Sequence, residues 1–183
     1  METLVTRIDG PKLMAPAVHG DERGFFAETY RESQLEELGV HERWVQDNQS
    51  RSQHAVVRGL HFQIGEGQAK LVRSARGTVF DVVVDLRGRS PTYGEWEGFE
   101  LSDENLRQLY VPVGFAHGFC VTSEVADVVY KCSSYYDPSA ERTIRYDDPD
   151  IGIEWPLHDL VPSERDASAP SLADVTHELD LWR

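Results

Sequence analysis

The sequence predicts an all-β fold, an antiparallel sandwich or barrel with a few short helices. Glycine and proline punctuate the middle of the chain about every ten residues, and the segments between them are short and rich in β-branched and aromatic residues. The clearest segment is Thr78–Leu86, in which side chains alternate between two faces. Val82 and Val84 are expected to face a core, whereas Asp81 and Asp85 share the other face.

The other strands are expected between the same punctuating residues. They are Ala55–Gln63, Gln68–Arg76, Trp96–Leu101, Gln108–Val111, His117–Thr122 and Asp127–Tyr135.

Helical signals are few. They are confined to Arg31–Leu38, where Ser33 is a candidate N-cap, to a short turn near Asp103–Arg107, and to Leu172–Val175. From Glu154 onward, prolines, tryptophan and charged residues alternate without a period, which predicts an irregular segment that wraps around the sheets.

Length and charge limit the classes of protein that fit. The 183 residues are expected to form one domain, 1–183, because this length buries a substantial core but divides poorly into two. We expect a cytoplasmic protein without a membrane partner, because the sequence has no run of about 18 apolar residues and no secretory signal. The net charge of −14 disfavours nucleic acid as a partner.

The two cysteines, Cys120 and Cys132, lie inside apolar runs and lack a CxxC spacing. This pattern favours buried thiols over a zinc site or a disulfide framework.

Two of the seven histidines stand out. The other five lie in polar, loop-like surroundings and are expected to be solvated: His19, His41, His54, His158 and His177. His61 lies in RGLHFQ, where alternation places Arg58 and Leu60 on one face and His61 and Gln63 on the other. Polar residues on an inner face are costly unless they line a pocket. His117, in VPVGFAHGF, enters a strand from a glycine-rich turn and can project into a barrel mouth, although a structural role for either histidine stays open.

A set of spaced motifs resembles one protein family. The motifs are RGFFAE, QDNQS, VVRGLHFQ, QAKLVR, GTVFDVVVDLR, SPTYGEW, VPVGFAHGF, YKCSSYY and DPDIGIEWP, in order from about Gly20 to Pro156. Together they resemble the dTDP-4-dehydrorhamnose 3,5-epimerases, the RmlC-like epimerases. The resemblance implies a cupin jelly roll, usually a homodimer, that acts without a cofactor on dTDP-4-keto-6-deoxyglucose in the pathway to dTDP-L-rhamnose.

The resemblance also implies roles for individual residues. His61 resembles the family's catalytic base and Tyr130 its opposing acid. Lys70 resembles the lysine that contacts the C4 oxygen of the sugar. Asp166, in SERDASAP, resembles the aspartate that pairs with the base.

Further positions match residues that bind the substrate. Arg58 resembles an arginine that grips the diphosphate, and His117 matches a second active-site histidine. The residues that match the nucleotide-binding positions, with some of the contacts made across the dimer, are Arg23, Phe26, Glu28, Gln46, Asn48 and Tyr136.

The implied chemistry requires residues of these types. Protons on C3 and C5 are acidic only because the C4 ketone accepts charge as an enolate, so a base and a cation are needed. His61 and Lys70 supply them, and histidine suits the base because its pKa lies near the operating pH. Inversion also needs a proton donor on the opposite face of the sugar, which is the role of Tyr130.

The sequence offers cations for the diphosphate but too few ligands for a metal ion. Arg58, Arg23 and Lys70 offer positive charge to an anionic diphosphate in an otherwise acidic protein. Metal-binding cupins commonly place two histidines and a carboxylate on one strand, whereas this strand has His61 followed by Gln63. We therefore expect no metal site.

Three alternatives have to be weighed. A relative that inverts only C3 or only C5 would use the same base and acid, so the motifs leave this alternative open. The tyrosine at position 130 argues against a catalytically silent cupin that only binds a nucleotide sugar, and the spacing of RGLHF and QAK argues against a 3,4-ketoisomerase.

Overall fold

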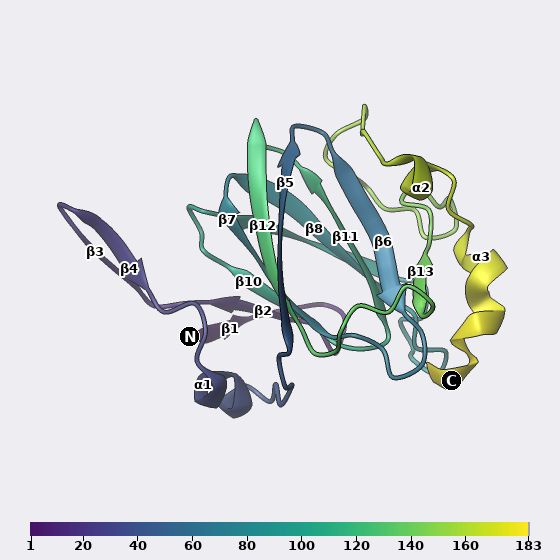
Figure 1. Ribbon diagram of the computed structural model, residues 1–183, viewed down its shortest axis with the longest axis horizontal. Helices are drawn as coiled ribbons and strands as arrows, with labels where there is room; N and C mark the ends of the chain where they lie inside the picture. Colours follow the sequence, from purple (N-terminus) through teal and green to yellow (C-terminus); the bar gives the residue numbers. More distant parts are fainter. Residues whose placement is uncertain (183) are drawn as a thin grey trace.

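The computed structural model describes residues 1–182 and has two antiparallel sheets that pack face to face (Figure 1). The six-stranded sheet has the order β1-β2-β10-β7-β12-β5 and the five-stranded sheet the order β13-β6-β11-β8-β9. A separate hairpin joins β3 and β4. This arrangement confirms the predicted all-β jelly roll.

The strands are short, and their labels follow the order of the chain. The six-stranded sheet consists of β1 (Glu2–Leu4), β2 (Lys12–Ala15), β5 (Gln46–Gln53), β7 (Lys70–Arg76), β10 (Gln108–Val111) and β12 (Val125–Cys132). The five-stranded sheet consists of β6 (Val57–Gln63), β8 (Thr78–Asp85), β9 (Trp96–Ser102), β11 (Phe115–Val121) and β13 (Glu141–Thr143). The hairpin strands are β3 (Val18–Asp21) and β4 (Gly24–Ala27).

All seven predicted strands are present, with small shifts at their ends. Six strands were not predicted: β1 to β5 and β13. The most informative of these is β5, because its sequence QDNQSRSQ is polar throughout and lacks any alternation of apolar residues. It forms an edge of the six-stranded sheet and pairs with β12 along its whole length.

Strand β8 is buried on both faces. Val79 and Val83 belong to the main core between the two sheets, together with residues such as Val72 and Phe119. Val82 belongs to a second cluster on the outer side of the five-stranded sheet. The prediction that Val82 faces a core is therefore confirmed, but the opposite face is buried as well.

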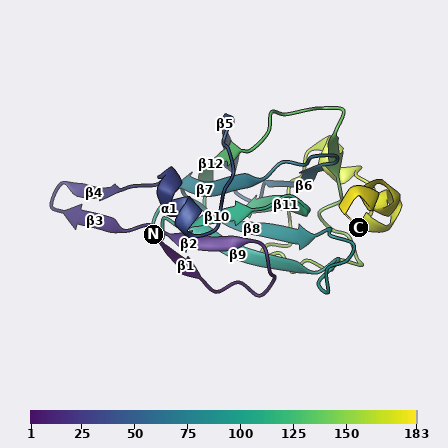
Figure 2. The same cartoon turned by 90° about the horizontal axis from the view of Figure 1, so that it is seen from below.

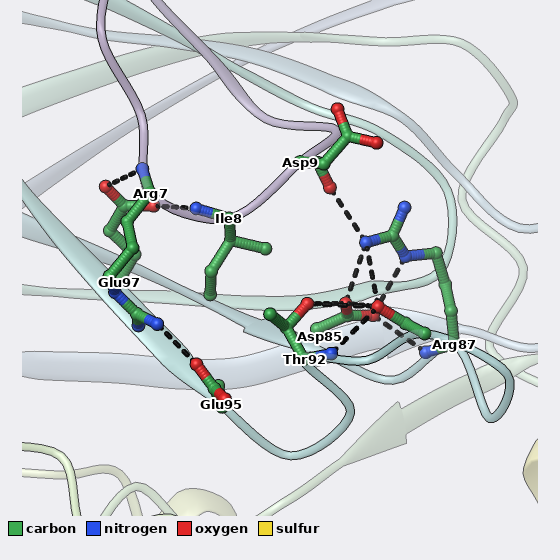
Figure 3. A network of polar contacts seen from close by, with 9 residues as sticks. Arg7, Ile8, Asp9, Asp85, Arg87, Thr92, Glu95 and Glu97 are labelled. Atoms are coloured by element: carbon green, nitrogen blue, oxygen red, sulfur yellow. Dashed lines mark hydrogen bonds and ion pairs between the residues drawn. The ribbon is translucent and has the colours of Figure 1, made fainter.

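The fully buried Asp85 organises the turn between β8 and β9, and the polar groups of that turn stabilise its charge (Figure 3). Its carboxylate accepts hydrogen bonds from the Arg87 guanidinium and from the hydroxyls of Ser90 and Thr92. These bonds outweigh the effect of burial and hold the pKa of Asp85 below its ordinary value. Arg87 also donates to the Asp9 carbonyl at 2.8 Å, so the turn is tied to the β1–β2 loop.

The same loop is fixed along the edge strand β9 (Figure 3). The Glu97 carboxylate accepts the backbone N–H groups of Arg7 and Ile8, at 2.8 and 2.9 Å. The Arg7 side chain in turn binds Glu95. The loop thereby covers the open edge of β9, which pairs with a strand on one side only.

The helices are short and mostly near the predicted places. Helix α1 (Glu32–Glu37) lies within the predicted segment, but its N-cap is Arg31, so the Ser33 cap was wrong. A turn at 103–105 and helix α3 (Leu172–Val175) agree with the predictions. Two elements were missed, α2 (Glu164–Ala167) and the 3-10 helix η1 (Thr176–Trp182). Over residues 1–182, no helix is long and apolar enough to cross a membrane.

The segment after Glu154 runs along β6 and then over the outer side of the five-stranded sheet (Figure 1). Val161 forms a parallel bridge with Val56, in which the Val161 N–H donates to the Ala55 carbonyl at 2.8 Å. Leu172 then packs into the second apolar cluster. These contacts fix α2 beside the middle of β6.

The β3–β4 hairpin extends away from both sheets, at the opposite end of the molecule from the C-terminal helices (Figure 2). Two adjacent phenylalanines on β4 are largely exposed, Phe25 at 61% and Phe26 at 69%. Large exposed aromatic side chains on a projecting hairpin indicate a contact surface.

Candidate active site

A register shift in β6 brings Arg58 and His61 to the same face. His117 of β11 pairs with His61, and Phe119 pairs with Arg58, so β6 contains one extra residue between the two pairs. The prediction that these two side chains lie on opposite faces was therefore wrong. Both line a pocket of about 420 Å³, which Asp166 also lines.

The shift depends on two glycines that cross at close range. Gly59 has a φ of +137°, and a Cβ at this position would lie 2.6 Å from the Cα of Gly118. Only glycine allows both the backbone angle and this approach. The backbone geometry thus explains Gly59 in the RGLHFQ motif and Gly118 in the VPVGFAHGF motif.

His61 is hydrogen-bonded to a carboxylate from the C-terminal segment. Its Nε2 atom lies 2.7 Å from Oδ1 of the buried Asp166 on α2. The Asp166 backbone N–H donates to the hydroxyl of Ser163, the N-cap of this helix, at 3.1 Å. Burial alone would raise the pKa of Asp166, but hydrogen bonds from His61, Ser163 and Gly59 hold it below the ordinary value.

Lys70 comes from the opposite sheet and approaches the same strand. Its Nζ atom donates to the main-chain carbonyl of His61 at 3.5 Å. Burial lowers the pKa of Lys70 by more than the neighbouring Cys132, Glu141 and Asp81 raise it. A lysine in this state is a cation whose charge is poorly solvated, and it gains from any negative charge brought close to it.

Tyr130 lies on the same sheet as Lys70, one strand further toward the edge. In β12 it pairs with Asn48 of β5 and with Val72 of β7, and its ring packs against the main core. Burial raises the pKa of its phenol, while Arg58 from the other sheet acts in the opposite direction. Tyr130 and His61 therefore face the interior from opposite sheets.

His117 forms a second histidine–carboxylate pair. Its Nε2 atom lies 2.9 and 3.1 Å from the two carboxylate oxygens of Asp81, and both residues are buried. Because His117 is the direct pairing partner of His61, the two dyads are neighbours on one face of the sheet. The five remaining histidines are exposed, as predicted.

The inner side chains of β5 form a polar row opposite these histidines. Ser52 accepts a hydrogen bond from Arg58 Nε at 2.9 Å, which links the two sheets. Gln46 donates to Asn48 at 3.1 Å and accepts the backbone N–H of Tyr136 at 3.0 Å. The polar side chains of β5, which prevented its prediction as a strand, thus line the site.

Two charged residues that contact each other near His61 were not predicted, Glu141 and Arg165. The Glu141 carboxylate accepts hydrogen bonds from the Tyr136 hydroxyl at 2.6 Å and from Arg165 at 2.9 Å. Burial opposes ionisation of Glu141, but these two bonds and the nearby His61 hold its pKa below the ordinary value. Arg165 lines the same pocket as His61. Its place next to Asp166 in SERDASAP was a usable signal, whereas nothing in DPSAERT marks Glu141.

The expected site residues that line this pocket are Arg58, His61 and Asp166, and three of the others lie on or next to the β3–β4 hairpin. Arg23 is at the exposed tip of the β3–β4 hairpin and binds Asp21. Phe26 is on the same hairpin, and Glu28 follows it and binds Arg31. Within one chain, the fold does not bring these residues to His61 (Figure 1).

In the part of the chain that the structure describes, 1–182, no group of three or more His, Cys, Asp or Glu side chains is arranged to hold a metal ion. Cys120 and Cys132 are buried free thiols, as predicted.

Comparison with known proteins identifies the family. The family model described as dTDP-4-dehydrorhamnose 3,5-epimerase matches residues 5–174. The chain belongs to this epimerase family. A curated member, the dTDP-4-dehydrorhamnose 3,5-epimerase of Salmonella typhimurium, is 53% identical over 175 residues, which cover 94% of this chain and 96% of that protein.

Solved structures of epimerases are closely similar as well. The dTDP-6-deoxy-D-glucose-3,5-epimerase of Legionella pneumophila, in complex with dTDP-4-keto-L-rhamnose, has a TM-score of 0.94 and 49% identity, and covers 97% of this chain and 96% of that chain. A more distant structure is ChmJ, a 3′-monoepimerase of Streptomyces bikiniensis in complex with dTDP-quinovose. Its TM-score is 0.87 at 36% identity, and it covers 94% of this chain and 88% of that chain.

Proposed function

We propose that the protein epimerises C3 and C5 of dTDP-4-keto-6-deoxy-D-glucose and forms dTDP-4-keto-L-rhamnose, as a step in the pathway to dTDP-L-rhamnose. One observation carries the proposal: His61 on one sheet, hydrogen-bonded to Asp166 of α2, faces Lys70 and Tyr130 on the other sheet. This arrangement supplies a base, a cation and a second proton donor on the facing sides of the two sheets.

His61 is the base in this proposal. Because its Nε2 atom is hydrogen-bonded to Asp166, the other ring nitrogen, Nδ1, is the one that accepts a proton from the sugar. Asp166 fixes this tautomer and stabilises the imidazolium that forms. The arrangement explains why a carboxylate is kept ionised in a buried place.

Lys70 stabilises the negative charge that develops on the C4 oxygen when the proton leaves. The enolate oxygen gives the poorly solvated ammonium group a charged acceptor, which binds it more strongly than the neutral His61 carbonyl does. The stabilisation is therefore larger in the enolate than in the ketone, as catalysis requires.

Tyr130 returns a proton from the face opposite His61. A tyrosine phenol is protonated at neutral pH, and burial raises the pKa of Tyr130 further, so the hydroxyl is available as a donor. A base and an acid on the two sides of the sugar ring invert a centre that one base alone would only exchange.

The anionic diphosphate is assigned to the arginines at the pocket. Arg58 and Arg165 both line it, and guanidinium groups bind phosphate oxygens with paired N–H donors. The nucleoside is assigned to the adjoining rim, where Tyr136, Gln46 and Asn48 are hydrogen-bonded into one group. His117 completes the polar wall behind the sugar.

We further propose a homodimer that acts in the cytoplasm. A second copy would supply Arg23, Phe26 and Glu28 to the nucleotide, because the projecting hairpin carries them away from the chain's own pocket. Its exposed aromatic side chains would be covered in the same contact. The cytoplasm is supported by Cys120 and Cys132, because free thiols persist in a reducing compartment.

The experiment is to incubate the protein with dTDP-4-keto-6-deoxyglucose in heavy water and to locate deuterium by proton NMR. We expect deuterium at both C3 and C5 of an L-configured product. Deuterium at C3 alone would favour a 3′-monoepimerase, the activity named for ChmJ. Migration of the carbonyl would indicate a ketoisomerase, and binding without any exchange would indicate a catalytically silent protein.

A further inference from the structure

Two exposed tyrosines lie on an irregular loop between β12 and β13. Tyr135 is 73% exposed and Tyr136 is 51% exposed. The loop has no regular secondary structure around them, and the backbone N–H groups of Tyr136 and Asp137 donate to side chains of other strands. Exposed aromatic rings can bind the base of a nucleotide by stacking, provided that the backbone holds each ring parallel to the base and in contact with it.

Gln63 holds this loop on both sides of the tyrosines. It is buried at the end of β6, two residues after His61. Its Oε1 atom accepts the backbone N–H of Asp137 at 2.7 Å, and its Nε2 atom donates to the Ser134 hydroxyl at 3.4 Å. One buried amide thus connects the strand of the proposed base to the residues that precede and follow the two rings.

The remaining contacts of Tyr136 lead into the pocket. Its backbone N–H donates to Gln46 and its hydroxyl donates to Glu141, which Arg165 also binds. A shift of the loop backbone would therefore move the Tyr136 ring relative to the groups assigned to the nucleotide. The contacts of Gln63 run to the loop backbone and to Ser134, so the amide acts on the ligand through the loop.

We propose that Gln63 is a positioning residue for nucleotide binding, which fixes the Ser134–Asp137 loop so that its tyrosine rings contact the base of the nucleotide sugar. The inference rests on the proposed function, in which Tyr136 lies at the nucleotide. It assigns a role to the glutamine of RGLHFQ that neither proton transfer nor diphosphate binding uses.

The test compares Gln63→Met, which keeps the length of the side chain, with Gln53→Met as a control at an exposed position. In Gln63→Met, the Kd for dTDP and the KM for the nucleotide sugar should rise roughly three- to tenfold, as for the loss of one or two hydrogen bonds. The value of kcat should stay within about twofold, because the proton-transfer groups are untouched. Inhibition by inorganic pyrophosphate, which has no base, should not change.

A double-mutant cycle separates positioning from general stability. In a protein that carries both Tyr135→Ala and Tyr136→Ala, Gln63→Met should cause no further rise in the Kd for dTDP. A purely structural glutamine would instead add its effect in both backgrounds and would change the melting temperature without changing the ratio of KM to kcat. If Gln63→Met does not fold, Gln63→Asn provides the same comparison, because its side chain is one methylene shorter and its amide no longer reaches the loop.

The outcomes also distinguish this inference from the function on which it rests. A wild-type protein that neither binds dTDP nor converts the nucleotide sugar would overturn both. An active wild type whose Gln63→Met and Gln63→Asn variants bind dTDP as tightly as the Gln53→Met control would overturn the positioning role alone.

Discussion

The Nε2 atom of His61 and the Oδ1 atom of Asp166 lie 2.7 Å apart, although the residues are separated by 105 positions in the chain. The contact exists because the C-terminal segment is bridged to β6 at Val161 and then enters α2 with Ser163 as its cap. The base is thus oriented by the C-terminal segment of the chain.

Asp166→Asn should lower kcat by about tenfold or more while KM stays within about threefold, because the amide keeps the shape but no longer stabilises the imidazolium. Asp159→Asn, an exposed change on the same segment, is the control. The folded pKa of Asp166 is depressed, so its contribution to stability is present above the ordinary aspartate pKa and is lost as pH falls through the folded pKa. Urea unfolding across the acid range should therefore show a smaller pH dependence in the variant.

Lys70 should set the alkaline limit of the pH–rate profile. Its pKa is lowered by burial, so kcat should decline at a pH below the usual lysine range, where the ammonium group loses its proton. Lys70→Arg should be slower overall but should move this limb to higher pH, because arginine stays protonated. An alkaline limb at the same pH in both proteins would assign it to another group, such as Tyr130.

Exhaustive chelation should leave the rate unchanged, because the enolate charge is assigned to Lys70 and not to a metal ion. The measurement is turnover before and after dialysis against a strong chelator. Activity that is lost on chelation and restored by a divalent cation would contradict the assignment.

Mixing two inactive variants tests the exchange of hairpins between copies. If Arg23 acts in the partner's site, a mixture of His61→Ala and Arg23→Ala proteins should contain hybrid dimers with one complete site. Activity should then exceed that of either variant alone after subunit exchange. Activity that stays at the sum of the separate variants would indicate that each chain uses its own Arg23.

Much of the fold was accessible from the sequence because seven strands show short apolar runs between turn residues. Strand β5 was not, because its inner side chains line a polar site and leave no hydrophobic period. The sequence also did not predict that Arg58 and His61 share a face. One extra residue in a strand reverses the alternation of side chains, and the two glycines at the crossing are its only sequence signal. Glu141 could not be predicted, because its importance arises from contacts across the fold.

Tyr130→Phe tests the central claim, that two groups on opposite sheets invert each centre. Phenylalanine keeps the packing against the core but removes the hydroxyl that returns the proton. By proton NMR in heavy water, deuterium should still enter the substrate through His61 with the original configuration retained, while inversion falls by about 10²–10⁴-fold, as for the loss of a general acid. Near-wild-type rates of both exchange and inversion in this variant would contradict the account.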